Sequence, residues 1–137
     1  MKNILLSLAL SVVTLFAFAT KPHIVETQIN TEESIVKWIG SKVTDSHEGT
    51  VNVMKGSLLI DHGKLAGGSI TIDMSTITNT DMEGRRKQKL EMHLKDEDFF
   101  NTKEFPIAEI KITRAVKGKG NMYKILADLT IKGITLP

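Results

Sequence analysis

The sequence contains no cysteine and few aromatic residues, with one tryptophan, one tyrosine and five phenylalanines in 137 residues. The lack of cysteine excludes disulfides, a cysteine nucleophile and a lipid-modified N-terminal cysteine. Stability must therefore come from packing, and the chain length fits one domain with one core. Because aromatic residues are scarce, a segment that concentrates them is expected to point into the core or into a cavity.

Charge of either sign is too evenly spread to indicate a nucleic-acid partner. Lysine and arginine number 18 and aspartate and glutamate 16, which gives a net charge of +2. The one concentrated basic patch comprises Arg85, Arg86, Lys87 and Lys89. Its ordinary interpretation is a solvated helix face, and the alternative is a role in holding the anionic head of a ligand.

Residue sets for catalysis or metal binding are also lacking. The sequence has no Gly-x-Ser-x-Gly elbow and no Ser-x-x-Lys arrangement, and the acids at 96–98 are typical of a solvated helix end. The histidines at 23, 47, 62 and 93 are not spaced as metal ligands, so a metal site could only be assembled across the fold. We expect no catalytic residues, no metal and no cofactor, and hence no enzyme.

Residues 1–19 have the pattern of a signal peptide. Lys2 is followed by an apolar run over 4–18, and Ala17 and Ala19 are small residues at the two positions that a signal peptidase reads. The run is shorter than the roughly 20 residues that span a bilayer, so a membrane anchor is the weaker alternative. We expect a periplasmic or secreted protein whose mature domain comprises residues 20–137.

Alternation of apolar and polar residues predicts that most of the mature chain is strand. The cleanest pattern is at 123–132, and Asp61 to Lys64 has the composition of a hairpin turn. Gly56, where the alternation changes phase, is expected to mark a bulge. Other strands are expected at 34–40, from Gly49 to 60, at 69–74 and at 108–113, with a leader at 20–30, a polar turn at 42–49 and a loop at 75–81.

One helix is expected, at 82–94, with Asp81 as its N-cap. Met82, Leu90 and Leu94 would form its apolar stripe. The segment that follows, 95–106, holds three of the five phenylalanines within seven positions. These rings are expected to close one end of the cavity that the strands enclose.

Several short motifs follow one another along the mature chain: Trp38, His47-x-Gly49, Ile72-Asp73-Met74, Leu90-x-x-His93-Leu94-Lys95, Asp98-Phe99-Phe100, Phe105-Pro106-x-Ala108 and Leu129-Thr130-Ile131-Lys132-Gly133-Ile134-Thr135-x-Pro137. In this order they resemble the YceI-like family over residues 31–137. The resemblance implies an exported bacterial protein with a lipocalin-like antiparallel β-barrel, one helix near the mouth, and a polyisoprenoid or another long amphiphilic lipid in the cavity. Family domains continue with further strands, so the barrel is expected to be incomplete at the C-terminus.

On this resemblance, mainly apolar residues are expected to contact the ligand, with His47 orienting its polar head. Two alternatives stay open, in which Trp38 is an ordinary core residue and His47 is a turn histidine bonded to local backbone. The expected ligand-binding residues are Trp38, His47, Ile72, Met74, Leu90, Phe99, Phe100, Phe105, Ile110, Ile125 and Leu129.

The expected function is to hold a long apolar amphiphile, isoprenoid or fatty-acid-like, for transport, storage or stress response. The alternative is a non-catalytic interaction or stress-response module with a packed barrel, which a cavity below roughly 300 Å³ would favour. An enzyme acting on a lipid-like substrate is a third hypothesis, with His47 as its best residue. The expected partner is an amphiphilic lipid, with no nucleic acid and no stable membrane span, and a homodimer is left open.

We predict that the exported protein begins at Thr20, because the small residues at 17 and 19 satisfy the specificity of the signal peptidase. N-terminal sequencing of the secreted or periplasmic product checks this. A mature product that retains Met1 would contradict the prediction.

Overall fold

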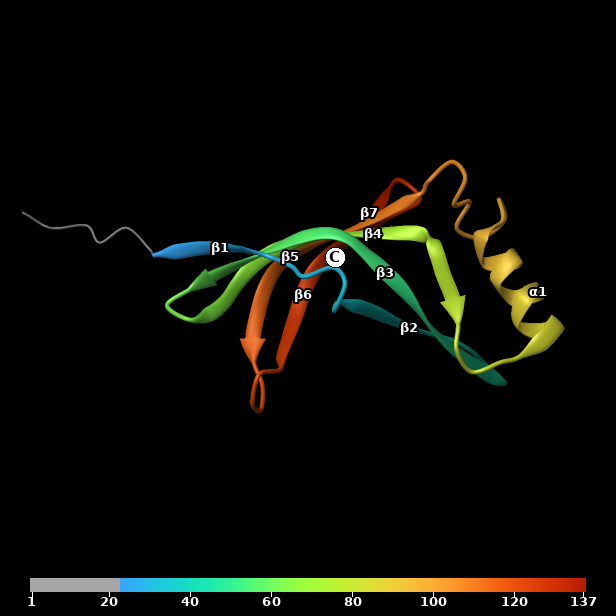
Figure 1. Cartoon of the computed structure of the whole chain (residues 1–137), viewed down its shortest axis with the longest axis horizontal. Helices are drawn as coiled ribbons and strands as arrows, with labels where there is room; N and C mark the ends of the chain where they lie inside the picture. The colour runs from blue at the N-terminus through green and yellow to red at the C-terminus, as the bar shows by residue number, and fades with distance from the viewer. Residues whose placement is uncertain (1–22) are drawn as a thin grey trace, which may run out of the picture.

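A computed structural model describes residues 23–137 as one antiparallel sheet with a single helix across one end (Figure 1). The expected signal peptide and its cleavage site lie outside the described residues. The elements are β1 (Ile24–Gln28), β2 (Ile35–Lys42), β3 (Asp45–Asp61), β4 (Lys64–Asn79), α1 (Gly84–Lys95), β5 (Ile107–Lys117), β6 (Tyr123–Ile131) and β7 (Ile134–Leu136).

The strand order across the sheet is β1-β3-β4-β5-β6-β7, and β2 also pairs with β3. β4 occupies one edge of β3, so β1 and β2 share the other edge, β2 near its start and β1 near its end. Within residues 23–137 no pairing joins β7 to β1 or β2, so the sheet is open. The all-β, antiparallel, lipocalin-like class with one short helix and an incomplete barrel is therefore confirmed.

Two-residue turns set the register of two hairpins. His62 and Gly63 have φ values of 48° and 76°, the left-handed pair of a tight hairpin turn, which confirms the turn expected there. Lys132 and Gly133 repeat this geometry with φ values of 51° and 74°. The second turn folds β7 back onto β6, a short pairing that the sequence analysis did not anticipate.

Several strands are longer than expected. β1 lies in the expected leader, β3 begins at Asp45 within the expected turn, and β4 runs through the expected loop to Asn79. Serine, threonine and asparagine are accommodated there because antiparallel partners satisfy the backbone, and because side chains such as Thr50 and Thr78 meet across the strands at 3.2 Å.

Gly56 is not the site of the bulge in β3. The register shifts lie between Thr50 and Asn52, between Val53 and Lys55, and between Leu59 and Ile60. Gly56 serves close approach instead, because a Cβ there would lie 2.7 Å from the carbonyl oxygen of Ser69.

α1 begins at Gly84, two residues later than expected, and its N-cap is Glu83 rather than Asp81. The Glu83 side chain makes no capping hydrogen bond. Leu94 is buried and Leu90 packs against the buried cluster of the sheet, so tertiary contacts hold this helix. Its position is therefore set by what it packs on and by the segment that leads into it.

A polar clasp, formed by His47, Glu48, Asn79, Asp81 and Glu91, anchors that segment. Asn79 is fully buried; its backbone N–H donates to Glu91 (2.8 Å) and its amide donates to the Glu48 carbonyl (3.1 Å) and to the Asp81 carboxylate. Asp81 also accepts from His47 Nδ1 (3.0 Å) and from the Glu48 backbone N–H (3.2 Å). The clasp joins the β2–β3 hairpin to α1.

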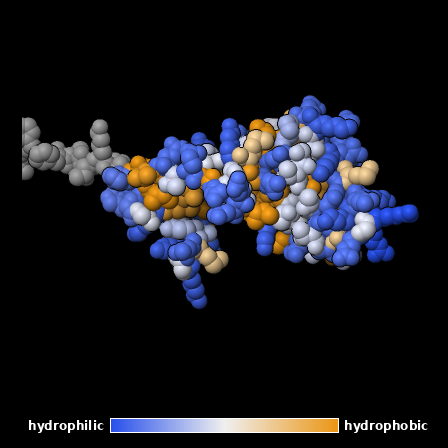
Figure 2. Space-filling view, viewed as in Figure 1, coloured by the Kyte–Doolittle hydropathy of each residue, from blue (hydrophilic) through white to orange (hydrophobic). Residues whose placement is uncertain are grey.

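The inner face of the sheet, defined by Val51, Ile72, Met74, Ala108 and Ile110, carries the core. Val51, Ile72, Met74 and Ala108 are buried with Ile77 and Leu94, and the cluster lies between the sheet and α1. Figure 2 shows apolar surface near the β1 end of the molecule and a second apolar area nearer α1. Apolar surface therefore extends well beyond the part that α1 covers.

Acid should lower the stability of the fold in part by protonating Asp81. The hydrogen bond from His47, together with those from Asn79 and the Glu48 backbone, lowers the pKa of Asp81 below its ordinary value of 3.8, against an opposing effect of desolvation. The clasp's contribution is thus fully present above pH 3.8 and is lost as pH falls through the lower folded pKa. Asp81→Asn should be less stable at neutral pH and should lose less stability on acidification.

Urea unfolding from neutral pH to below pH 3.8 measures this difference. Glu109→Gln, which changes an exposed acid on the sheet, is the control and should keep the wild-type pH profile. If Asp81→Asn and the wild type lose the same amount of stability on acidification, the prediction is contradicted.

Candidate functional site

An apolar cavity of about 280 Å³ lies on the inner face between the sheet and α1. Strands β2 to β6, α1 and the aromatic segment after α1 all contribute to its wall. Every lining residue is apolar or glycine: Val36, Trp38, Ile39, Gly40, Val51, Ile72, Met74, Ile77, Leu94, Phe99, Phe100, Ala108, Ile110, Leu129 and Ile131.

Strand register brings the wall together. Ile72 pairs with Ala108, and Ile110 pairs with Leu129, so neighbouring strands present apolar residues to the same side. Alternation then sends the intervening polar residues, such as Glu109, to the other face. The wall therefore follows from the alternating pattern once the strand pairing is set.

Trp38 is held firmly in this wall. Its indole Nε1 donates to the carbonyl oxygen of Thr78 at 3.1 Å. Its ring lies over Gly49, where a Cβ would overlap both the ring and the Thr78 carbonyl. The absence of a side chain at Gly49 thus creates the space that Trp38 occupies, which is a physical reason for the His47-x-Gly49 motif.

Phe99 and Phe100 form the end of the cavity nearest the turn after α1. Their rings meet edge to face at 82°, with centroids 4.7 Å apart, and both line the cavity. Lys132 Nζ donates to the carbonyl oxygens of Phe99 (3.1 Å) and Glu97 (2.8 Å). The β6–β7 turn therefore helps to hold the aromatic pair in place.

Seven of the eleven residues expected to contact a ligand line the cavity: Trp38, Ile72, Met74, Phe99, Phe100, Ile110 and Leu129. Leu90 packs behind the wall, and Phe105 lies beside the β6–β7 turn, its ring 3.5 Å from a Cβ placed on Gly133. Ile125 lies further along β6 and is exposed. Their contact with a ligand stays a prediction.

His47 lies outside the lining and belongs to the polar clasp. Its Nδ1 contacts Asp81, and its Nε2 lies 3.5 Å from the carboxylate of Asp45. It is thus neither bonded to local backbone only, as one alternative held, nor part of the cavity wall, and its role towards a head group stays a prediction. The basic patch is likewise outside the lining: it lies on α1, where Lys87 approaches Glu91 at 3.9 Å.

Eight wall residues were missing from the expected set: Val36, Ile39, Gly40, Val51, Ile77, Leu94, Ala108 and Ile131. Most share a face with an expected residue, as Val36 does with Trp38 and Ile131 with Leu129, so alternation could have found them. Ile77 could not have been found in this way, because it lies in a stretch with loop composition. Ile39 is out of phase with Trp38, and no pattern pointed to it.

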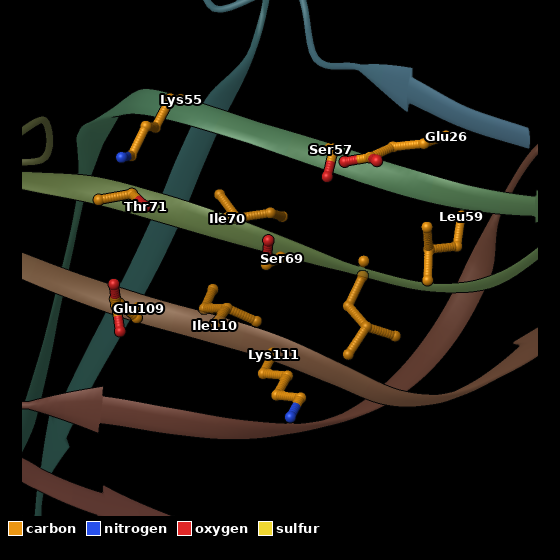
Figure 3. A pocket seen from close by; sticks show the side chains of 12 residues that line it. Glu26, Lys55, Ser57, Leu59, Ser69, Ile70, Thr71, Glu109, Ile110 and Lys111 are labelled. Carbon is orange, nitrogen blue, oxygen red and sulfur yellow. The ribbon is translucent and has the colours of Figure 1, made fainter.

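A larger hollow of about 560 Å³ lies over β3, β4 and β5, with polar side chains of the outer face around it (Figure 3). Lys55, Glu109 and Lys111 are exposed charges of both signs, and Figure 3 shows Glu26 extending from β1 toward Ser57. Ligand sites are usually concave and mostly apolar with a few convergent polar groups. Despite its smaller volume, the apolar cavity is therefore the candidate site.

Two chemical features are not found in the described part of the chain. Among residues 23–137, no group of three or more histidine, aspartate or glutamate side chains is placed to hold a metal ion. In the same range, no helix is both long enough and apolar enough to cross a membrane.

Comparison with known proteins gives a consistent result. The YceI-like domain matches residues 28–137. A UPF0312 protein of Shewanella denitrificans is 32% identical over 90 residues, which are 65% of this chain and 44% of that protein. A UPF0312 protein of Photorhabdus laumondii and Protein YceI of Escherichia coli O157:H7 are each 32% identical over 89 residues, with the same coverage. The match thus spans less than half the length of these curated relatives.

Gly49→Ala should destabilise the fold by about 1–3 kcal/mol, because the added methyl group must displace Trp38 or the Thr78 carbonyl. Urea unfolding measures the loss, and the emission of Trp38, the sole tryptophan, reports its displacement. Gly40→Ala is the matched control, because its Cβ would meet the same ring at an ordinary 3.8 Å. Equal stability and equal emission of the two variants would contradict the role assigned to Gly49.

Proposed function

Because the chain belongs to the YceI-like family, with its domain matching residues 28–137, we propose that it binds a long apolar amphiphile in the cavity under α1. The ligand class is isoprenoid or fatty-acid-like, and the role is transport, storage or stress response. Export to the periplasm or the medium is part of this proposal. The observation that carries it is a cavity wall made entirely of apolar residues and glycine.

The energetics of such a wall suit a hydrocarbon chain. Each buried methylene contributes about 0.8 kcal/mol without any directional bond. The one hydrogen-bond donor among the wall side chains, the indole N–H of Trp38, is already bonded to Thr78. A polar or charged ligand group would therefore lose its hydration there and gain no partner.

The volume of the cavity gives some support to the alternative of a packed interaction module. About 280 Å³ lies just below the roughly 300 Å³ typical of the smallest ligand pockets. However, Leu129 in the cavity wall is partly exposed, and the inner face continues beyond the cavity as exposed apolar surface at Ile125. A long chain could bury its end in the cavity and lie along this surface, which favours the binding proposal.

Filling the cavity should abolish uptake of lipid. Leu129→Trp puts a large ring into the wall, and we expect it to weaken binding of added isoprenoid or fatty acid by about tenfold or more. Native mass spectrometry of the full chain, purified without detergent, measures both co-purified lipid and uptake.

Leu126→Trp is the matched control for this experiment. Leu126 is on the same strand but on the opposite face, and it is exposed. This variant should bind as the wild type does. A wild-type protein that carries no lipid and takes up none would overturn the proposed function in favour of the packed module.

A further inference from the structure

Another hollow, of about 350 Å³, lies between the β3–β4 and β5–β6 hairpins. Both hairpins turn at the end of the sheet opposite α1 (Figure 1). Its wall combines aliphatic residues of the first hairpin with polar residues of the second. The lining residues are Leu58, Ile60, Gly63, Leu65, Lys117, Asn121 and Tyr123. The side of the hollow formed by the first hairpin is thus mainly aliphatic, and the side formed by the second is polar.

This hollow and the cavity under α1 lie on the same face. Along β6, Tyr123, Ile125, Ala127 and Leu129 alternate onto one side, and Leu129 lines the cavity. Tyr123 pairs directly with Lys117 across β5, which places both at the far end of this side. An apolar strip through Ile125 and Ala127 therefore joins the cavity under α1 to the hollow beside Lys117 and Tyr123.

The two ends of the strip differ in charge. No ionisable residue lines the cavity under α1, and the nearby His47 is held by two carboxylates. At the far end, Lys117 is exposed, and within residues 23–137 no carboxylate lies within ion-pair distance of its ammonium group. A cation beside an apolar trough, with a phenol and an amide at its sides, fits an anionic head group.

We propose that the hollow around Lys117, Asn121 and Tyr123 is the head-group site of an amphiphile with an anionic head, such as a fatty acid. The hydrocarbon chain runs along Ile125 and Ala127 and ends in the cavity under α1. From Tyr123 to Leu129 the strand rises by about 20 Å, which requires a single long chain. This inference rests on the proposed function, and it adds the charge of the ligand's head group and the end of the sheet at which that head group lies.

Two probes that differ only in the head group test the polarity. Hexadecanoate and hexadecanol have the same chain, and only the first is an anion. Calorimetric titration of the full chain should show that Lys117→Gln weakens hexadecanoate binding by about threefold to tenfold and leaves hexadecanol binding unchanged. Added salt should weaken hexadecanoate binding in the wild type more than in the variant.

Lys124→Gln is the matched control. Lys124 is an exposed lysine of the same hairpin that alternates onto the other face of the sheet, so its loss should change neither affinity. Equal losses in the two lysine variants, or no loss in Lys117→Gln while both probes bind, would overturn the head-group site and leave the proposed function standing. If neither probe binds the wild type, the proposed function fails and this inference fails with it.

Discussion

The inner face of the sheet is apolar from the cavity under α1 as far as Ile125, but one short helix can cover only one end of it. This mismatch governs the rest of the structure. The buried residues of the core cluster, such as Ile72 and Ala108, lie between the sheet and α1, whereas further along the same side Ile125 is 43% exposed. A continuous exposed apolar surface usually marks a place where something binds. The uncovered part of this face is the surface on which the proposed binding of an amphiphile rests.

The covered end depends on polar contacts that lie outside the cavity wall. α1 starts without a side-chain cap, and a helix of this length is marginal by itself. The buried Asn79 ties the segment before α1 to Glu48 on β3 and to Glu91 on α1 itself. After α1, Lys132 anchors the chain by donating hydrogen bonds to the carbonyl oxygens of Glu97 and Phe99. Changes at these residues should therefore alter the cavity although none of them lines it.

Local patterns in the sequence carried much of this architecture. The alternation along β6 predicted which residues share a face, and the composition of 61–64 predicted the β3–β4 hairpin. The concentration of phenylalanines after α1 predicted that Phe99 and Phe100 line one end of the cavity. The predictions that were wrong concern residues whose structure depends on partners distant in the sequence. Asp81 has the residue type of an N-cap, but His47, 34 residues earlier, recruits it to the clasp. β1 and the end of β4 have weak strand patterns and are strands because β3 pairs with them.

The inner face has an apolar end and an end that carries the exposed Lys117, and this division bears on selectivity. A wall without free donors or acceptors can discriminate between hydrocarbon chains only by size, and one methylene changes the binding energy by about 0.8 kcal/mol. The cavity under α1 would thus accept many chains of similar length. A polar group that must be satisfied discriminates more sharply, because a wrong partner leaves it desolvated and unpaired. In the proposed binding mode, selectivity for the kind of amphiphile would therefore come from the Lys117 end of the sheet, and the α1 end would contribute affinity.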